Sequence, residues 1–354
     1  MKTRSAYVKA PWMCEVREVD LPDAPPPGQV LIQVQACGVC GTDVTAAAEK
    51  AKDWRPFGHE VAGIVRKVGP GYATAEPGYA QAKPGVERLK EGQAVVLESS
   101  SFCGWCDVCR DGRVDLCHGR APGFWSQPAM GFSDLMLAPY RGVVPYEGLT
   151  PEVACLAEPA GVAYDMVKTA DIQMGDRVCL VGPGPIGLMA AALVLHRGAS
   201  RLLCIGKSSN AVRLKAAADL GAETLAVDGS LVECKDLARQ FDHVLMTAPT
   251  QFIVPGLSLL DYGGEMTYIG IGTGDSAIRF DANDFHFRKL QLRASFASPA
   301  IYYPAVLRLL ESGVIPGPKM ISHVFSLAEA PLAIAACRDE KHSMLKVVIR
   351  PDKG

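Results

Sequence analysis

Residues 177–206, RVCLVGPGPIGLMAAALVLHRGASRLLCIG, decide the fold of the chain. The run RVCLVG is typical of a buried strand, PIGLMAAALVLHRG is an apolar segment of helix length that ends at Gly198, and RLLCIG is typical of a second strand. A strand, a helix and a strand in this order predict a βαβ unit. Because AVRLKAAADLGA, HVLMTA and GGEMTYIGI continue the alternation, we expect a doubly wound parallel sheet over residues 152–290 and an α/β fold.

The turn GPGPIG between the first strand and the helix carries the pattern G-x-G-x-x-G. In this context the pattern is typical of dinucleotide binding. The first two glycines allow a tight turn and close approach to a pyrophosphate, and the third lets the helix pack on the strand. The helix N-terminus offers unpaired N–H groups to the anion. We therefore expect nucleotide contacts from Gly182, Gly184, Pro185, Ile186 and Gly187.

The end of the second strand indicates which nucleotide binds. In NAD-binding turns of this kind an acidic residue about 20 residues further on binds the ribose 2′-hydroxyl. Here Gly206 is followed by Lys207 and Ser208, and a cation beside hydroxyl groups suits a 2′-phosphate. A solvated loop charge at Lys207 is the alternative. The sequence predicts that NADP is preferred over NAD, with Gly206, Lys207, Ser208 and Arg213 as further nucleotide-binding residues.

The rest of the chain indicates a second domain. A length of 354 residues is long for one core. Residues 1–151 hold short β-type runs such as VLIQVQA and VAGIVRKV between turn signals, which favours a barrel-like unit. Residues 291–354 end in the strand-like run MLKVVIR, and we expect this tail to return to the first domain.

Charge and hydropathy exclude several partners. The formal net charge is -2, with 36 basic and 38 acidic residues, so no basic footprint predicts binding to nucleic acid or an anionic membrane. The N-terminus is charged where a signal peptide needs an apolar core, and no apolar run approaches the roughly 20 residues that span a bilayer. We expect a cytoplasmic protein whose partner is a small molecule.

Four cysteines form a compact loop in FCGWCDVCRDGRVDLC. Structural zinc sites take four thiolates in a tetrahedron, and this spacing lets one short loop supply all of them. Two disulfides are the alternative, but nothing in the sequence points to an oxidising compartment. The sequence predicts a structural zinc ion bound by Cys103, Cys106, Cys109 and Cys117.

Three further motifs supply candidate ligands for a second metal ion. GVCGTD contains Cys40, GHE contains His59 and Glu60, and CLAEPAG contains Glu158. Catalytic zinc keeps three protein ligands and an open position for water or substrate, and a thiolate, an imidazole and a carboxylate fit that requirement. Each residue alone is more often structural. Their occurrence together with the glycine turn and the cysteine loop favours a catalytic site.

The chain resembles the zinc-containing medium-chain dehydrogenases over essentially its full length. The motifs GVCGTD, GHEVAGIVRKVG, CGWCDVCRDGRVDLC, CLAEPAGVAYD and GPGPIG fall in the order of that family. The nearest branch is the polyol, sugar and threonine dehydrogenases, because Glu158-Pro159 stands where simple alcohol dehydrogenases use a cysteine. The resemblance implies a GroES-like β-rich catalytic domain (1–151 and 291–354), a Rossmann cofactor domain (152–290), an active site in the cleft, and a homodimer or homotetramer.

The resemblance also implies roles. Cys40, His59 and Glu158 would be catalytic zinc ligands, with Glu60 as an alternative that the sequence leaves open. Thr42 would hydrogen-bond the substrate oxygen and pass on its proton, and Asp43 would orient the ligand histidine. The expected reaction is hydride transfer between NADP(H) and a secondary alcohol, polyol or sugar through a zinc alkoxide.

The chain departs from that pattern at three places. Thr45 and Asp165 stand where many members carry histidines, and the segment 72–93 is longer than usual. Two other functions share part of the motifs: a zinc-free reductase acting on an activated C=C bond, and a non-catalytic NADP-binding protein. The set Cys40, His59 and Glu158 favours the dehydrogenase over both.

Overall fold

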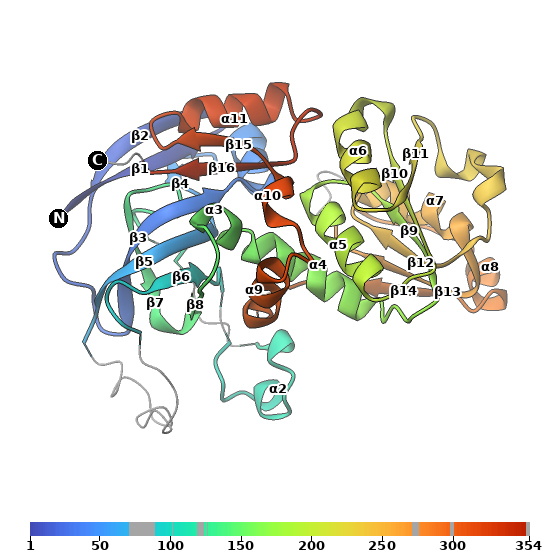
Figure 1. Cartoon of the computed structure of the whole chain (residues 1–354), viewed down its shortest axis with the longest axis horizontal. Helices are drawn as coiled ribbons and strands as arrows, with labels where there is room; N and C mark the ends of the chain where they lie inside the picture. The colour runs from blue at the N-terminus through green and yellow to red at the C-terminus, as the bar shows by residue number, and fades with distance from the viewer. Residues whose placement is uncertain are drawn as a thin grey trace.

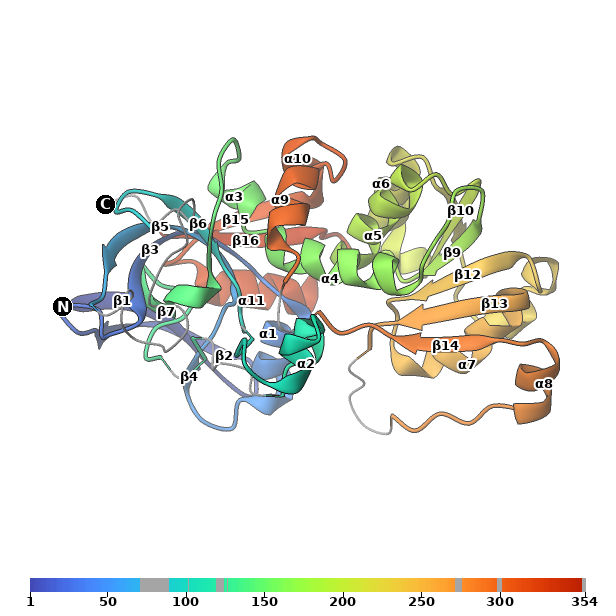
Figure 2. The same ribbon diagram turned by 90° about the horizontal axis from the view of Figure 1, so that it is seen from below.

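The computed structural model of the chain describes residues 1–70, 89–100, 102–118, 124–125, 127–270, 276–297 and 301–351. Two lobes lie side by side, and the green helix α4 (Ala157–Thr169) lies between them (Figures 1 and 2). Most of the predicted long segment 72–93 lies outside the described residues.

One lobe, the parallel-sheet lobe, is built on strands β9 to β14. All neighbouring pairs are parallel, and the order β11-β10-β9-β12-β13-β14 is that of a Rossmann sheet. Because the chain reverses direction across the sheet between β9 and β12, a switch point opens at their carboxyl ends. The strands are β9 (Arg177–Val181), β10 (Arg201–Gly206), β11 (Glu223–Ala226), β12 (Phe241–Met246), β13 (Leu260–Tyr268) and β14 (Gln291–Ala294).

The last of these strands corrects a predicted boundary. The sequence placed the end of the parallel-sheet domain at residue 290, but β14 pairs with β13 from Gln291 to Ala294. The run QLRA lies at the sheet edge and none of its residues is fully buried, so it lacks the apolar pattern that marks a strand.

Helices cover the faces of this sheet. The longest, α5, begins at Pro185, whose missing N–H is tolerated in the first turn, and ends before Gly198, which adopts the left-handed conformation. It is apolar nearly all round because it lies inside the main core. The helices of this lobe are α5 (Pro185–His196), α6 (Ala211–Asp219), α7 (Ile253–Gly256) and α8 (Ala282–Phe287).

The other lobe, the β-rich lobe, is built on β1 to β8 with the C-terminal strands β15 and β16. A seven-stranded sheet runs β15-β16-β3-β5-β6-β8, with β7 paired to β3, and a three-stranded sheet runs β2-β1-β4. The C-terminal tail therefore returns to the first part of the chain. The strands are β1 (Lys2–Lys9), β2 (Met13–Asp20), β3 (Gln29–Gly38), β4 (Arg55–Pro56), β5 (Glu60–Val68), β6 (Ala94–Leu97), β7 (Leu135–Pro139), β8 (Val143–Pro145), β15 (Ile321–Ser326) and β16 (Lys346–Arg350).

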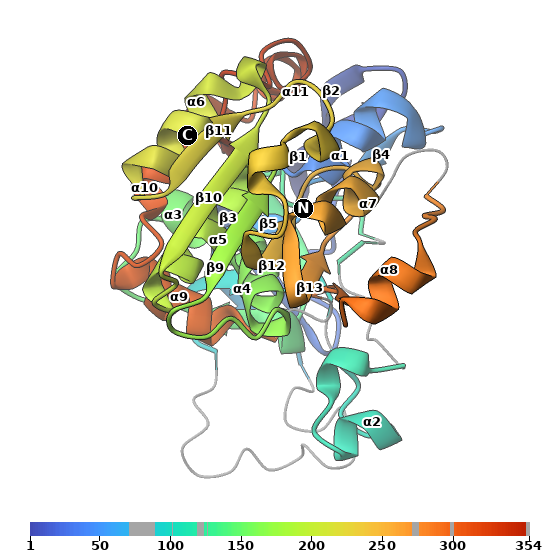
Figure 3. The ribbon, with the colours of Figure 1, turned by 90° about the vertical axis from the view of Figure 1, so that its right-hand side faces the viewer.

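Short helices connect these strands. None of the helices in the described part of the chain is long and apolar enough to cross a membrane. The loop that carries α2 projects away from the sheets (Figures 1 and 3). The helices of this lobe are α1 (Gly41–Thr45), α2 (Asp107–Arg110), α3 (Pro151–Ala154), α9 (Tyr303–Glu311), α10 (Gly317–Met320) and α11 (Ala330–Asp339).

The largest hydrophobic core is shared by both lobes. It contains Ala36 and Val348 of the β-rich sheet, Leu180 of β9 and Leu193 of α5. Small residues of α4 such as Ala160 are fully buried between them. Packing on both sides fixes α4, and with it the position of Glu158 in its first turn.

Candidate active site

Cys40, His59 and Glu60 come together where β3 ends and β5 begins, at the centre of the β-rich sheet. One ligand atom from each lies within 4.8 Å of the others. Cys40 caps the N-terminus of α1, just after β3, while His59 and Glu60 stand at the start of β5. The antiparallel register of β3 and β5, which pairs Gly38 with Glu60, creates this meeting. His59 and Glu60 are buried.

The Asp43 carboxylate joins the two segments. Its Oδ2 accepts a hydrogen bond from the Cys40 N–H at 2.9 Å, and its Oδ1 lies 3.6 Å from His59 Nδ1. Burial would lower the pKa of His59, but the charges of Asp43 and Cys40 outweigh burial and hold this pKa well above its usual range. Asp43 therefore lies where it can orient the imidazole, leaving the other ring nitrogen for a metal.

A buried ion pair lies behind this group. Lys346 Nζ, from β16, contacts Glu60 Oε1 and donates to the Val39 carbonyl at 2.9 Å. Burial alone would lower the pKa of Lys346, yet the charge of Glu60 raises it above its ordinary value. The lysine is therefore charged and offsets part of the negative charge of the Glu60 carboxylate.

The second carboxylate oxygen of Glu60 indicates that a metal ion fits here. Glu60 Oε2 is buried and has no hydrogen-bond partner among the described residues. An unsatisfied buried polar atom costs about 1–3 kcal/mol, and more when it is charged. A thiolate, an imidazole and a carboxylate oxygen are ligands that zinc prefers, so the residues fit a zinc ion.

Glu158 lies outside the set of ligand atoms within 4.8 Å that the described residues form. It is half-buried at the start of α4. Burial raises its pKa to about 7, against the opposing charge of His59. The structure brings three of the four predicted catalytic ligands together and leaves Glu158 beside them.

The cysteine loop forms a second compact group. The Sγ atoms of its four cysteines lie within 4.8 Å of one another, and Cys103 and Cys117 are 3.5 Å apart at sulfur. A disulfide needs about 2.05 Å between sulfurs, and all twelve cysteines are free, which excludes the disulfide alternative in this structure. The Cys103 N–H points to Cys117 Sγ at 3.2 Å, as suits a thiolate ligand.

The glycine turn after β9 fits a pyrophosphate. A Cβ at Gly187 would lie 2.4 Å from the Gly182 carbonyl oxygen, so no other residue fits there. Gly182 itself has φ +100°. A Cβ at Gly184 would meet no atom of the described residues within 4 Å, although this residue caps α5. Space for an anion is therefore left in front of the helix N-terminus, flanked by Pro185 and Ile186.

The loop after β10 lies against a carboxylate that the sequence did not predict, that of Asp228. Gly206 packs against Pro183, Lys207 is exposed, and the Ser208 N–H donates to Asp228 Oδ1 at 2.9 Å. Hydrogen bonds from Ser208 and the charge of Lys207 lower the pKa of Asp228. The predicted 2′-phosphate loop thus faces an acidic side chain contributed from beyond β11.

Arg213 lies elsewhere. Its guanidinium donates to the carbonyls of Lys341 at 2.6 Å and Met344 at 2.9 Å, in the turn between α11 and β16. Asn210 contacts His342 of the same turn. The arginine predicted to bind nucleotide therefore joins the two lobes at the end of the nucleotide loop.

Comparisons with known proteins identify the family. Residues 26–148 match the alcohol dehydrogenase GroES-like domain, and residues 185–312 match the zinc-binding dehydrogenase family. A Mycobacterium tuberculosis (strain CDC 1551 / Oshkosh) protein described as a probable alcohol dehydrogenase is 31% identical over 341 residues, 88% of each chain. The chain belongs to the zinc-containing medium-chain dehydrogenases.

Other relatives of this medium-chain dehydrogenase extend the comparison. L-galactonate-5-dehydrogenase of Escherichia coli (strain K12) is 28% identical over 326 residues, 88% of each chain. Alcohol dehydrogenase TADH from Thermus sp. ATN1 is 26% identical, with a TM-score of 0.82 over 99% of this chain and 100% of that one. A candidate zinc-binding dehydrogenase from Sinorhizobium meliloti 1021, solved with NADP, is 25% identical, also with a TM-score of 0.82 over 99% and 100%. The predicted GroES-like and Rossmann fold and the dehydrogenase class are confirmed.

Trp125, Thr42 and Thr45 of this dehydrogenase lie near the candidate metal ligands Cys40, His59 and Glu60, which together are called the metal group. The Trp125 ring lies 5.3 Å from that of His59, and its indole N–H donates to the Ser99 carbonyl at 2.7 Å. Thr42 is exposed on α1. Thr45 donates its hydroxyl proton to the Gly41 carbonyl at 2.9 Å, so that hydroxyl is engaged within α1.

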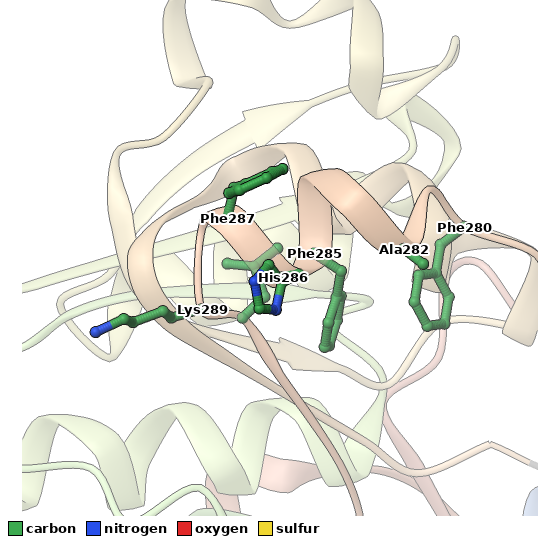
Figure 4. Close-up of a pocket in the computed structure, with 7 residues that line it drawn as sticks. Phe280, Ala282, Phe285, His286, Phe287 and Lys289 are labelled. Carbon is green, nitrogen blue, oxygen red and sulfur yellow. The ribbon is translucent and has the colours of Figure 1, made fainter.

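A hollow of about 550 Å³ lies apart from these groups, at α8. Its lining includes the aromatic side chains of Phe280, Phe285 and Phe287 (Figure 4). None of the residues predicted to bind metal or nucleotide lines it. The candidate active site is therefore defined by ligand geometry and the strand ends, and not by this hollow.

Proposed function

We propose that this dehydrogenase transfers a hydride between NADP(H) and a secondary alcohol, polyol or sugar. The observation that carries the proposal is the convergence of Cys40, His59 and Glu60 on one point. Relatives named L-galactonate-5-dehydrogenase, sorbitol dehydrogenase and scyllo-inosose 3-dehydrogenase support a polyhydroxylated substrate.

Cys40 and His59 would hold a zinc ion, with Glu60 or Glu158 as the third protein ligand. When bound, zinc supplies Lewis acidity toward the substrate oxygen. Glu60 has one oxygen free of hydrogen bonds and one paired with Lys346, so it can approach the metal without losing its cation. Glu158 stands close enough for its charge to interact with His59, so it would be the other candidate for the third ligand position.

The Thr42 oxygen would accept the proton of the substrate hydroxyl as the Thr42 hydroxyl gives up its own proton. This residue is exposed, so it delivers the proton directly to water. Thr45 does not continue the relay, because its hydroxyl donates to the Gly41 carbonyl. Asp43 keeps the His59 ring in the orientation that leaves Nε2 for the metal.

The nucleotide pyrophosphate would lie on the turn formed by Gly182, Gly184 and Gly187, with Pro185 and Ile186 beside it. Lys207 would bind the 2′-phosphate, together with the Ser208 hydroxyl. The exposed ammonium of Lys207 favours a phosphate, whereas Asp228 opposes it, so the NADP preference rests on the balance between these two charges.

The remaining assignments follow the family. Residues 1–151 with the C-terminal segment form the catalytic domain, and residues from 152 through β14 form the cofactor domain. A second zinc ion in the cysteine loop has a structural role, and two or four chains assemble through the cofactor domains.

Elemental analysis of purified protein tests the metal assignment. We expect two zinc ions per chain in the parent and one in Cys40→Ser, with oxidation of secondary alcohols lost in the variant. Cys14→Ser is the matched control, since Cys14 lies in β2 away from both cysteine-containing groups. One zinc ion per chain in both parent and Cys40→Ser would instead favour a zinc-free reductase.

A further inference from the structure

A buried hydrogen bond joins α4 to the segment that follows β14. The Ser295 hydroxyl donates to Asp165 Oδ2 at 2.5 Å, and both residues are 8% exposed. Asp165 lies on α4, whereas Ser295 directly follows β14. A hydrogen bond to a carboxylate is shorter and stronger than one between neutral groups, so this contact holds the chain firmly as it leaves the parallel sheet.

Asp165 lies on the same helix as Glu158, which stands beside the metal group. Glu158 and Asp165 are seven residues apart, which places them on one face of α4 and about 10 Å apart along its axis. Between them Gly161 packs against the ring of Tyr303, where a Cβ would lie 3.5 Å from the ring. The same helix face therefore carries the carboxylate beside the metal group and the carboxylate that holds Ser295.

Ser295 lies at the carboxyl end of the sheet. Ligands of open α/β sheets bind outside the carboxyl ends of the strands, and the Gly182 turn follows β9 at that edge. Because a hydride passes directly from carbon to carbon, the nicotinamide must lie between this edge and the metal group. The segment 295–297 directly follows β14 at that edge, and the chain leaves β14 in the direction of the β-rich lobe (Figure 2).

Neighbouring contacts attach the same crossing segment to α4. Arg293 donates to the Thr169 carbonyl at 2.9 Å, and Lys168 lies over the ring of Tyr302 at 4.9 Å. Burial, with the charge of Asp165, raises the pKa of Tyr302 to about 12. Asp165 therefore interacts with Tyr302 as well, while its hydrogen bond with Ser295 holds the residue that directly follows β14.

We propose that Asp165 is a positioning residue that, by holding Ser295, sets the backbone of residues 295–297 against the nicotinamide ring. This inference rests on the proposed function. Backbone groups held at a fixed place can hydrogen-bond the nicotinamide carboxamide, which determines the distance and angle of hydride transfer. A displacement of about 1 Å at such a place costs up to about 100-fold in rate.

The test compares Ser295→Ala, Asp165→Ala and Asp165→Asn with the parent. Asp165→Asn keeps an acceptor oxygen for Ser295 and serves as the conservative rescue. Ser200→Ala is the matched control, because it removes a hydroxyl hydrogen bond of the same length, 2.5 Å to the Gly175 carbonyl, at the opposite end of the sheet. The readouts are the emission of bound NADPH, the deuterium isotope effect on kcat/KM, and the unfolding temperature.

In Ser295→Ala and Asp165→Ala we expect a changed emission of bound NADPH, a roughly tenfold loss of kcat and a larger isotope effect. The double variant should lose no more than either single variant, and Asp165→Asn should remain near the parent. Unfolding temperatures that fall with unchanged emission and kcat would overturn the proposal. Because the emission requires no turnover, it tests the positioning role even if the parent oxidises no alcohol, which would refute the proposed function alone.

Discussion

Lys346 Nζ and Glu60 Oε1 form an ion pair whose side chains are only 3% and 1% exposed. Removing one partner of such a pair leaves an uncompensated buried charge, which typically destabilises a protein by about 3–5 kcal/mol. We expect Lys346→Met to lower the free energy of unfolding by about that amount, measured by urea denaturation. The exposed pair of Lys2 and Glu18 provides the control, and Lys2→Met should cost less than about 1 kcal/mol. Equal losses in the two variants would contradict the interpretation.

The raised pKa of Glu98 predicts that the stability of the protein depends on pH. This residue follows β6 and is buried, and burial raises its pKa from 4.5 to about 8. The folded chain therefore retains a proton that the unfolded chain releases above pH 4.5, so stability decreases as pH rises from 4.5 to 8. Between pH 5 and pH 8 the parent should lose on the order of 3 kcal/mol of unfolding free energy relative to Glu98→Gln. The exposed Glu91 supplies the control variant, Glu91→Gln, which should follow the parent at every pH.

Two glycines of the turn after β9 should have different roles, one in nucleotide binding and the other in the stability of the fold. In Gly184→Ala the added methyl meets no atom within 4 Å in the part of the chain that the structure describes, but it enters the space assigned to the pyrophosphate. We expect NADPH binding, measured by fluorescence titration, to weaken by roughly tenfold or more, with the unfolding free energy changed by less than about 0.5 kcal/mol. Gly187→Ala should instead destabilise the fold by roughly 1–3 kcal/mol, because its Cβ would lie 2.4 Å from the Gly182 carbonyl oxygen. Unchanged NADPH affinity in Gly184→Ala would exclude this turn as the nucleotide site.

Charges at the end of β10 should set the choice of nucleotide. Lys207→Asp is expected to reduce the ratio of kcat/KM with NADP to that with NAD by about tenfold or more, because it removes a cation and adds an anion beside the 2′-phosphate. Asp228→Asn should shift the ratio in the opposite direction. Lys235→Asp makes the same charge change at another exposed position of the lobe and should leave the ratio unaltered. A ratio that stays constant in Lys207→Asp would remove the basis of the NADP assignment.

Short sequence motifs predicted those parts of the fold and of the candidate site whose residues are close together in the chain. The glycine turn and the cysteine loop each bring their residues together within a short stretch, so spacing alone predicts their geometry. The meeting of Cys40 with His59 depends on strand register, and here the family resemblance supplied what periodicity could not. Lys346 was not predicted, because it is 286 residues from Glu60 and only the return of β16 brings them together. Strand β14 was placed outside its sheet for a related reason, since an edge strand without a fully buried side chain carries little apolar signal.

The place of β16 also determines when the site is completed. Cys40, His59 and Glu60 are synthesised before Lys346, which lies 286 residues beyond Glu60. Until Lys346 has been synthesised and β16 has paired with β3, the Glu60 carboxylate has no lysine beside it, so a nascent chain presents a more negatively charged ligand set to metal ions than the finished enzyme does. Zinc captured during synthesis would therefore be held by a different balance of charge, and the arrival of the last strand would convert that early site into its mature form.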